Sequence, residues 1–381
     1  MARNTNGKGF SLKDELFNEK KVAYLGGLFA GECTEFNQRL FVETTMEDML
    51  DLELKQRVVC ITKALEQQLP SDFKKAALMI VQALPEPLSL TKTDDDFGSF
   101  IFAPLGEYVV RNGLTEEHLE TSLATLREIT MRFSMEDAIR YFLNEFEAET
   151  MKELGNWVDD ENYHVRRLVS EGTRPLLPWS GRISLEVTAP VPFLDTLHAD
   201  GTRYVTRSVA NHMNDIAKIE PDLVVASLHS WRKQGRQEEK ELDWMTRHSL
   251  RTLLKQGHAE ALEMLGYHTD PRVEVERFSV SKSSQKIVPG DTLNFSFEIT
   301  AQHDEKLMVD YMIDFVKANG KTKPKVFKIK KVDLKKGETI SVEKKHRFVK
   351  DATTFTFYPG KHTLTLQING KKMGVATFEV T

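Results

Sequence analysis

The sequence predicts an all-α solenoid of paired helices followed by an all-β sandwich, and three observations lead to this fold class. Apolar residues recur at three- and four-residue spacing through most of residues 10–268. A short motif with an arginine at its third position recurs three times, each forty residues after the last. From about residue 270 the pattern becomes the alternation typical of strands. We therefore expect two domains, at residues 1–269 and 270–381.

The helical part contains several clear amphipathic segments and start signals. LELKQRVVCITKALEQQL (52–69) and DFKKAALMIVQAL (72–84) place their apolar side chains on one helical face. Pro221 stands where a first-turn proline fits ahead of DLVVASLHSW. Ser134 followed by Met135-Glu136-Asp137 resembles a capping box before AIRYFLNEF, so the sequence predicts that a helix starts there.

The repeat is the most informative regularity. VRRLVSEGTR starts at Val165, VTRSVANHMN at Val205 and MTRHSLRTLL at Met245, and a second helical stretch follows each block. Helix pairs of about forty residues are typical of HEAT-like repeats, which stack into a solenoid with a concave face. An arginine ladder on that face could track a phosphate backbone. Alternatively, such arginines bridge neighbouring repeats through carboxylates. The equivalent arginines are Arg167, Arg207 and Arg247.

The C-terminal part predicts about seven short strands over roughly 105 residues. Turn signals at Pro289-Gly290, Asn319-Gly320, Lys336-Gly337, Pro359-Gly360 and Asn369-Gly370 separate the alternating segments. Such a series suggests an antiparallel sandwich of immunoglobulin type, here without a disulfide.

Charge is distributed unevenly along the chain. The net charge is −5, but residues 1–160 hold 17 Lys and Arg against 29 Asp and Glu, whereas residues 270–381 hold 21 against 14. This asymmetry could orient the protein on a polyanion. Alternatively, lysines in the strands only protect the edges of a sheet.

Several protein classes are disfavoured by composition. The N-terminus lacks the apolar stretch of a signal peptide, and no apolar run approaches the ~20 residues that span a bilayer. Cys33 and Cys60 are expected to be buried thiols in a reducing cytoplasm. No CxxC or HExxH spacing predicts a metal site.

Five stretches resemble one family. DENYHVRRLVSEGTRPLLPW (160–179) looks like the signature region of AlkC-type DNA alkylation repair glycosylases, members of the HEAT-like repeat DNA glycosylase superfamily. VDYMIDFVKANGKTKPKVFKIKK (309–331) is similar to the C-terminal Ig-like domain that one subgroup carries. The remaining similar stretches are FSLKDELFN (10–18), SMEDAIRYFL (134–143) and RSVANHMNDIAKIEPDLV (207–224).

The resemblance implies an activity. Such enzymes hydrolyse the N-glycosidic bond of cationic N-alkylated bases, such as N3-methyladenine, in double-stranded DNA during base excision repair. They use no cofactor, and their superfamily is known for excision without full base flipping. The resemblance therefore implies a DNA partner and a cytoplasmic, nucleoid-associated protein. Nothing in the sequence demands an oligomer, so we expect a monomer.

Four residues on the matching motifs are the candidates for catalysis: Glu171, Trp179, Glu136 and Asp215. Glu171 is assigned the central role beside the sugar and the attacking water, and Trp179 that of an aromatic wall. Glu136 and Asp215 would complete an acidic pocket, although Asp137 could replace Glu136.

Each of these candidates also has a purely structural interpretation. Glu136 and Asp137 would suit a helix N-terminus, and Glu171 could pair with Arg167 four residues earlier. Trp179 could be a loop plug packed on the core. Asp215, with Asn211 and Asn214, could lie on a solvated helix face.

The candidate DNA-contacting residues are basic side chains of both domains. In the sandwich, the lysines around the Asn319-Gly320 turn could reach a groove, because the family's Ig-like domain is thought to clasp DNA. A HEAT scaffold without catalytic activity and a lesion-sensing DNA-binding relative are the alternative functions. The candidates are Arg166, Arg167, Arg174, Arg207, Arg247, Lys321, Lys323 and Lys325.

Overall fold

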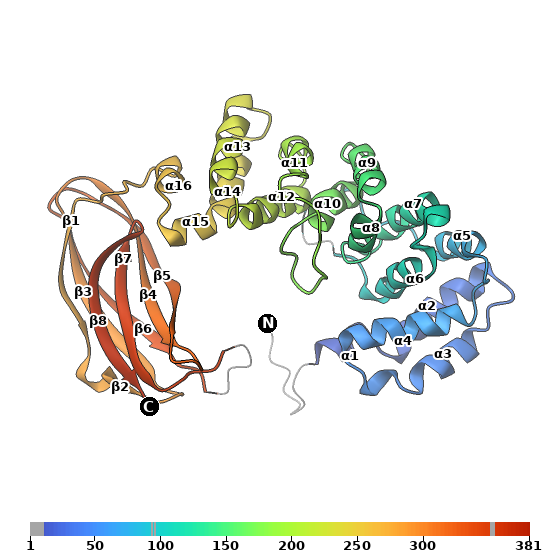
Figure 1. The fold of residues 1–381 in the computed structure, drawn as a ribbon, viewed down its shortest axis with the longest axis horizontal. Helices are drawn as coiled ribbons and strands as arrows, with labels where there is room; N and C mark the ends of the chain where they lie inside the picture. The colour runs from blue at the N-terminus through green and yellow to red at the C-terminus, as the bar shows by residue number, and fades with distance from the viewer. Residues whose placement is uncertain (1–10, 93, 95–96, 351–354) are drawn as a thin grey trace. The chain divides into compact units, whose positions relative to one another are not determined.

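The computed structural model describes residues 11–92, 94, 97–350 and 355–381 (Figure 1). These residues form two compact units. One unit contains the described residues up to Glu220 together with Ala226–Ser249, and the other contains Pro221–Val225 together with the described residues from Leu250 onward. Each unit is described by itself below.

The first unit is built from helices that follow one another along the chain (Figure 1). Leu, Ile, Val and Phe side chains at helical spacing form its core, as the periodicity predicts. The helices are α1 (Leu12–Leu16), α2 (Glu19–Glu32), α3 (Gln38–Met46), α4 (Leu54–Glu66), α5 (Phe73–Ala83), α6 (Ala103–Gly113), α7 (Leu119–Thr130), α8 (Ile139–Glu145), α9 (Glu147–Trp157), α10 (Tyr163–Gly172), α11 (Val191–Leu197), α12 (Arg203–Ile216), α13 (Pro221–Gln234, of which Pro221–Val225 belong to the second unit) and α14 (Glu239–Ser249).

The forty-residue repeat is visible in the packing. The first two predicted blocks begin within α10 and α12, whereas the third begins in α14 and continues into α15 (Arg251–Gln256). Helices α10, α12 and α14 pack side by side in that order. The second helix is α11 in the first repeat and α13 in the second repeat. Helix α13 begins at Pro221, as predicted. The prediction of an all-α HEAT-like solenoid followed by an Ig-like sandwich is confirmed.

Ion pairs connect each repeat to the next. Arg127 of α7 contacts Asp160 at 2.6 Å, and Arg166 of α10 contacts Asp200 at 2.6 Å. Both aspartates also accept a hydrogen bond from the backbone N–H two residues later, so they shape the turn that enters the next helix. In the same way Arg203 of α12 donates to a carboxylate of α14, that of Glu241, at 2.7 Å. We call these pairs the inter-repeat ladder.

The predicted helix start at Ser134 is wrong. The helix α8 begins only at Ile139, and Glu136 lies in the preceding turn rather than in a first helical turn. The hydroxyl of Ser134 donates to the Glu136 carboxylate at 2.5 Å instead of capping a helix. An N-cap hydroxyl has to accept from a backbone N–H, but the oxygen of Ser134 accepts instead from Nη1 of Arg167 at 2.8 Å, so it caps no helix.

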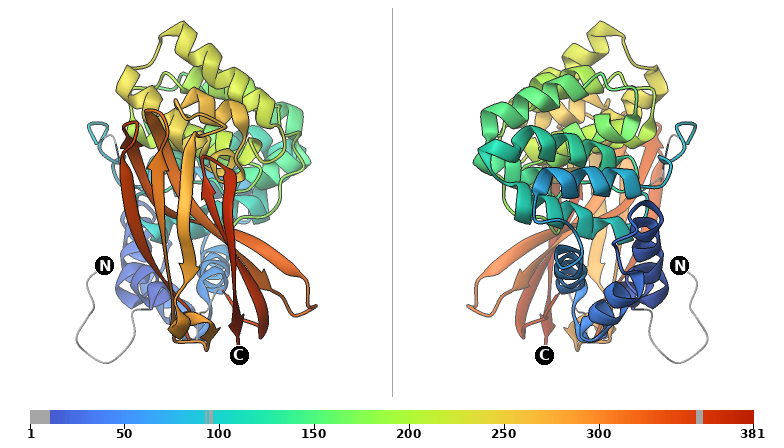
Figure 2. Two further views of the ribbon diagram at one scale, coloured as in Figure 1. Left: turned by 90° about the vertical axis from the view of Figure 1, so that its left-hand side faces the viewer. Right: turned by 90° about the vertical axis from the view of Figure 1, so that its right-hand side faces the viewer.

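The second unit contains a sandwich of two sheets (Figures 1 and 2). One sheet has the order β1-β3-β6 and the other β2-β8-β7-β4-β5. Pairing is antiparallel except between the two-residue strand β2, which the sequence did not predict, and β8. The strands are β1 (Val273–Val280), β2 (Lys286–Ile287), β3 (Thr292–Ala301), β4 (Glu305–Val316), β5 (Thr322–Leu334), β6 (Thr339–Arg347), β7 (Gly360–Ile368) and β8 (Lys371–Val380).

Two short helices, α15 (Arg251–Gln256) and α16 (Ala259–Met264), belong to this second unit. Gly257 ends α15 in the left-handed conformation and meets Gly370 of the β7–β8 turn so closely that a Cβ on Gly370 would lie 2.2 Å from the Gly257 Cα. The side chain of Asn369 donates to the carbonyl of His268 at 3.0 Å. Thus the helical stretch just before the sandwich is anchored to it by backbone contacts.

Two further sequence expectations concern cysteines and membranes. Cys33 and Cys60 are both free thiols, but the expectation that they are buried is wrong, because both side chains are only half-buried. None of the helices within the described ranges is long and apolar enough to cross a membrane.

Candidate active site

Helix α10 buries polar side chains that would normally face solvent. Asn162 caps its first turn by accepting a hydrogen bond from the His164 N–H. Arg167, Ser170 and Glu171 are all buried on this helix. Because a buried charge is costly unless it is paired, each of these side chains needs partners close by.

The partners form a line of six charged groups of alternating sign, which we call the charge chain. It connects the turn before α8, helix α10, the residues after α10 and helix α12. Its net charge is zero, and three of the four predicted catalytic residues belong to it. The members, in order, are Glu136, Arg167, Glu171, Arg174, Asp215 and Lys218.

The first half of the charge chain is centred on Arg167. Its Nη1 donates to Oε2 of Glu136 at 2.7 Å and to the Ser134 hydroxyl at 2.8 Å. Its Nη2 lies 3.7 Å from Oε1 of Glu171, the i,i+4 pair that the helix spacing predicts. Its guanidinium also stands 4.5 Å above the ring of Tyr204, a cation–π contact. Arg167 therefore connects two predicted catalytic carboxylates.

The second half is centred on Arg174. Its Nη1 donates to Oε1 of Glu171 at 2.6 Å, while Nε and Nη2 donate to Oδ2 of Asp215 at 3.0 and 2.9 Å. The Lys218 ammonium then donates to Oδ1 of Asp215 at 3.0 Å. Asp215 is 2% exposed, so the alternative that it lies on a solvated helix face is wrong.

Electrostatics fix the protonation states of the central groups. Burial alone would raise the pKa of Glu171, but Arg167 and Arg174 hold that pKa below its usual value. Burial likewise opposes the charge of Arg167 and of Arg174, yet the neighbouring carboxylates raise the pKa of both guanidiniums. Glu171 is therefore an ionised carboxylate at neutral pH, able to accept hydrogen bonds and to stabilise positive charge.

Trp179 lies in the segment between α10 and α11. Its side chain is 91% exposed, so the loop-plug alternative, with the ring packed on the core, is wrong. Its backbone has φ 70°, a left-handed conformation that is costly for a bulky residue. Its role as an aromatic wall stays a prediction.

Arg140 of α8 holds this segment in place. Its Nη1 donates to the carbonyls of Gly172 and Arg174 at 3.0 and 2.7 Å, and its Nε donates to the carbonyl of Gly181 at 3.0 Å. Arg140 thereby contacts the segment on both sides of Trp179. Burial lowers the pKa of this guanidinium, which is 2% exposed.

The predicted DNA-contacting arginines have different environments. Arg166 is engaged in the inter-repeat ladder and donates to the carbonyl of Asp160 at 2.7 Å. Arg174 is engaged in the charge chain. Arg247 is exposed on α14. For Arg166 the geometry favours the alternative in which the arginine bridges neighbouring repeats.

Arg207 pairs with Asp94, which lies in the segment between α5 and α6. Nearby, Phe97 of the same segment packs edge-on against Tyr204, with 5.7 Å between the ring centroids. The Tyr163 hydroxyl donates to the carbonyl of Ser89 at 3.2 Å. Residues Ser89, Asp94 and Phe97 therefore contact the same helices that carry the charge chain. The Arg207 guanidinium, which the sequence assigned to DNA phosphate, is therefore paired with the carboxylate of Asp94.

The ends of this segment are fixed by backbone hydrogen bonds. The Leu88 N–H donates to the carbonyl of Met131 at 3.0 Å, and the Ser99 N–H donates to that of Arg132 at 3.1 Å. Gly98 has φ +74° and lies so close to Arg132 that a Cβ would be 1.9 Å from its carbonyl oxygen. Only glycine fits there.

Comparisons with known proteins cover nearly the whole chain. A family model described as the C-terminal Ig-like domain of the uncharacterised protein YhaZ matches residues 274–381. YhaZ of Bacillus subtilis (strain 168) is 35% identical over 370 residues, which cover 96% of this chain and 98% of that protein. The structure of Pseudomonas fluorescens alkylpurine DNA glycosylase AlkC, bound to DNA containing an abasic site analog, matches with TM-score 0.84 and 31% identity. That match covers 98% of this chain and 100% of the AlkC chain.

The chain belongs to the AlkC-type family of DNA glycosylases. The resemblance inferred from the five stretches is thereby confirmed for both domains. At the level of the family, the activity is excision of alkylated bases in DNA repair.

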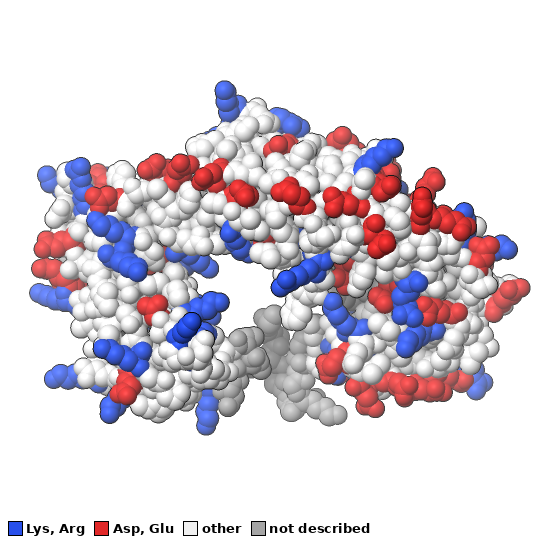
Figure 3. Space-filling view, viewed as in Figure 1, with Lys and Arg blue, Asp and Glu red and all other residues white. Residues whose placement is uncertain are grey.

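In this AlkC-type chain the sandwich presents lysines along the edge strand β5. Lys321, Lys323 and Lys325 are exposed at and after the β4–β5 turn. The Lys325 ammonium lies 5.5 Å above the ring of Phe327. Figure 3 shows Lys and Arg gathered over the strands and Asp and Glu over the N-terminal helices, as the segment charges predict. Both DNA contact and edge protection remain compatible with these lysines.

Two residues of the AlkC-type site escaped the sequence reasoning. Ser208 of α12 donates to Oε2 of Glu171 at 2.6 Å, and Arg140 holds the Trp179 segment. Ser208 directly follows the repeat arginine Arg207, so its place in the repeat could have drawn attention to it. Arg140 carried no signal, because a single arginine in an amphipathic helix is normally solvated.

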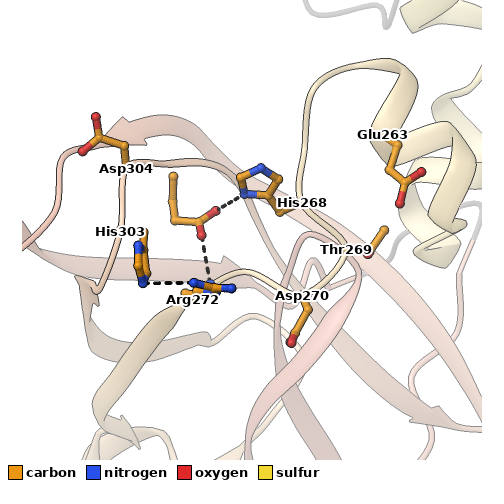
Figure 4. Close-up of a pocket in the computed structure, with 8 residues that line it drawn as sticks. Glu263, His268, Thr269, Asp270, Arg272, His303 and Asp304 are labelled. Carbon is orange, nitrogen blue, oxygen red and sulfur yellow. Dashed lines mark hydrogen bonds and ion pairs between the residues drawn. The ribbon is translucent and has the colours of Figure 1, made fainter.

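A hollow of about 750 Å³ lies in the second unit, and none of the predicted site residues lines it (Figure 4). The buried Glu305 carboxylate contacts Nδ1 of His268 at 3.0 Å and accepts from the Arg272 N–H at 3.1 Å. Asp304 and Asp270, at its rim, pair with Lys335 and Lys371. Its lining is Glu263, His268, Thr269, Asp270, Arg272, His303, Asp304 and Glu305. The contacts of Glu305 and Asp270 connect the segment between α16 and β1 to the strands β4 and β8.

Proposed function

We propose that this AlkC-type chain hydrolyses the N-glycosidic bond of cationic N-alkylated bases, with N3-methyladenine as the type substrate, in double-stranded DNA. One observation carries the proposal. Glu171 is an ionised carboxylate at the middle of the charge chain, and its side chain keeps 7% exposure.

The chemistry of the substrate explains why such a carboxylate suffices. A positively charged alkylated purine is neutralised as it leaves, so it needs no proton from a general acid. Ordinary glycoside hydrolysis, by contrast, divides acid and base roles between two carboxylates. The enzyme has only to stabilise the cationic sugar and to deprotonate the attacking water. An ionised Glu171 serves both purposes.

The neighbouring groups have supporting roles in this proposal. Glu136 and Asp215 hold Arg167 and Arg174, and these arginines keep Glu171 ionised and fixed. Glu136 suits this role better than Asp137, whose side chain is 52% exposed and pairs with Lys55 at 3.6 Å. The charge chain remains neutral as a whole, so the negative charge of Glu171 is available locally for a developing cation.

Trp179 is proposed to contact the DNA at the lesion. An exposed aromatic ring can stack on a base or sugar and attract a cation by about 0.5–2 kcal/mol. Its left-handed backbone and the Arg140 contacts around it favour a pre-set orientation. The proposal includes excision without full base flipping. In that case the Trp179 ring contacts the lesion at the surface of the duplex.

DNA binding is proposed to depend on exposed basic groups. Arg247 and the lysines of the β4–β5 turn are the best placed of the predicted contacts. Their contacts would make binding salt-dependent with little sequence preference. We propose further that the protein acts as a monomer on the nucleoid.

The test is base release from methylated duplex DNA. Wild type, Glu171→Gln and the exposed control Glu149→Gln are incubated with the same DNA, and released bases are separated by chromatography. We expect wild type and the control to release N3-methyladenine, whereas Glu171→Gln should be slower by about 10²–10⁴-fold, the usual contribution of a general base. Duplex affinity is measured for all three at several salt concentrations.

The alternatives predict different results. Tight, salt-dependent binding by wild type without base release would support a lesion-sensing protein. Absence of both binding and release would support a HEAT scaffold for a protein partner. Release by Glu171→Gln at the wild-type rate would leave a glycosylase whose base is a different residue.

A further inference from the structure

The two carboxylate oxygens of Glu171 have different neighbours. Oε1 accepts from Arg174 at 2.6 Å and lies 3.7 Å from Arg167, so both cations stand on its side. Oε2 accepts a hydrogen bond from the hydroxyl of Ser208 at 2.6 Å. We infer that Ser208 is a positioning residue, which holds Oε2 of Glu171 in the orientation that takes the proton of the attacking water. This inference rests on the proposed function.

The direction of the hydrogen bonds follows from the chemistry of the groups. The Ser208 hydroxyl lies 2.9 Å from the hydroxyl of Ser170 as well as 2.6 Å from Glu171. It has one proton, and an ionised carboxylate can only accept. Ser170 and the Glu171 carboxylate are thus alternative acceptors for the one Ser208 proton, and the charged oxygen at the shorter distance is the stronger of the two, so Ser208 donates to Glu171. Both serines are buried.

The inequality of the two oxygens decides which one acts as the base. Two guanidiniums draw electron density toward Oε1, while a neutral hydroxyl leaves Oε2 the less neutralised of the pair. In the proposed step the water oxygen bonds to C1′ and one water proton passes to Oε2. The C1′–N bond breaks with its electron pair going to the base, which leaves neutral.

Burial makes the hydroxyl hard to replace. Ser208 is 2% exposed, so a solvent molecule has little access to the place that its hydroxyl leaves. Without that donor the carboxylate is free to rotate about its last bond, and both oxygens are drawn toward the arginines. The rotated carboxylate stays ionised but no longer presents Oε2 to the water.

The acid side of the pH profile gives a second, independent readout. The hydrogen bond from Ser208 favours the charged form of Glu171, so its loss raises the pKa of that carboxyl. Because the base must be ionised, the acid limb of the rate profile moves to higher pH. The other charged or titratable groups around Glu171 are Arg167, Arg174, Arg140, Glu136, Asp215, Tyr204 and His212. They remain in place in the variant.

The experiment compares Ser208→Ala and Ser208→Thr with wild type and with the exposed control Ser230→Ala. Single-turnover base release at saturating protein is followed from about pH 4 to pH 9, with duplex affinity and melting temperature recorded for each variant. Ser208→Ala should release base about 10- to 100-fold more slowly, the usual effect of losing a hydrogen bond to a charged group. Its affinity for DNA should be unchanged and its acid limb shifted upward. Ser208→Thr, which keeps the hydroxyl, should retain rate and profile.

Several results would overturn the inference. Ser208→Ala with the wild-type rate shows that the hydroxyl only fills space, and a slower rate with an unmoved acid limb shows that Glu171 is not its target. A folded Ser208→Thr that is as slow as Ser208→Ala also overturns it. These results leave the proposed function intact as long as wild type releases base and Glu171→Gln does not. A wild type without base release overturns the proposed function itself.

Discussion

Replacing Arg174 by glutamine should destabilise the helical unit strongly, because this guanidinium is shared by two buried carboxylates. Arg174→Gln removes the three hydrogen bonds to Glu171 and Asp215, whose side chains are 7% and 3% exposed. Only Lys218 then remains beside Asp215. Breaking a buried ion pair on one side costs about 3–5 kcal/mol. For a unit of this size that corresponds to a fall of roughly 6–20 °C in melting temperature.

Urea unfolding of the full chain, followed by the circular dichroism of the helices, measures this loss. The exposed control Arg247→Gln should change the free energy of unfolding by less than about 0.5 kcal/mol. The double variant Arg174→Gln/Asp215→Asn should recover part of the loss, because the amide that replaces the Asp215 carboxylate leaves no uncompensated charge at that position. A loss under about 1 kcal/mol, or a double variant no more stable than the single one, would refute the role of the charge chain.

The same experiment has a pH dependence with a defined sign. The pKa of Glu171 is lower in the folded protein than its ordinary value of 4.5. Its pairing therefore stabilises the fold above pH 4.5, and this contribution is lost as the pH falls through the lowered folded value. The difference between wild type and Arg174→Gln should shrink on acidification. A difference that is constant down to pH 3 would mean that the loss is not electrostatic.

Two further predictions follow from other buried or paired groups. Asp94→Asn should tighten binding to undamaged duplex about two- to fivefold, which corresponds to the free energy of one exposed ion pair. The reason is that Arg207 can then contact a phosphate without a competing carboxylate. Fluorescence polarisation at low salt measures the affinity, and an unchanged affinity contradicts the prediction. Burial lowers the pKa of His212 to about 3 from 6.5, so the unfolded chain binds the extra proton between these values. As the pH is lowered through that window, the free energy of unfolding should fall by about 1.4 kcal/mol per pH unit. An equal slope in His212→Gln would exclude this histidine as the cause.

Much of the fold could be predicted because its signals are local and periodic. The forty-residue spacing of Val165, Val205 and Met245 sets the three helices that pack side by side. The change from helical to alternating periodicity near residue 270 falls between the end of α16 at Met264 and the start of β1 at Val273. The short strand β2 could not be predicted, because two residues carry no period.

The site was only partly predictable, since a helix pattern does not say what covers a polar face. The sequence placed Glu136, Glu171 and Asp215 together through family motifs, but their neutralisation by Arg167 and Arg174 depends on contacts between distant segments. A sequence pattern cannot indicate that the four buried charges, Arg167, Glu171, Arg174 and Asp215, compensate one another. The Ser134 prediction failed for the same reason, because its hydroxyl donates to the Glu136 carboxylate and accepts from Arg167 instead of from a backbone N–H.

The exposure of Trp179 also gives the protein an optical probe. The chain has four tryptophans, and the other three are shielded: Trp157 and Trp231 are buried, and Trp244 lies stacked between His248 and Arg203. The solvent-relaxed, red-edge part of the intrinsic emission therefore comes from Trp179. Any event that covers this ring shifts or quenches that component selectively, so unlabelled protein can report, in a stopped-flow trace, the moment at which its loop meets a surface.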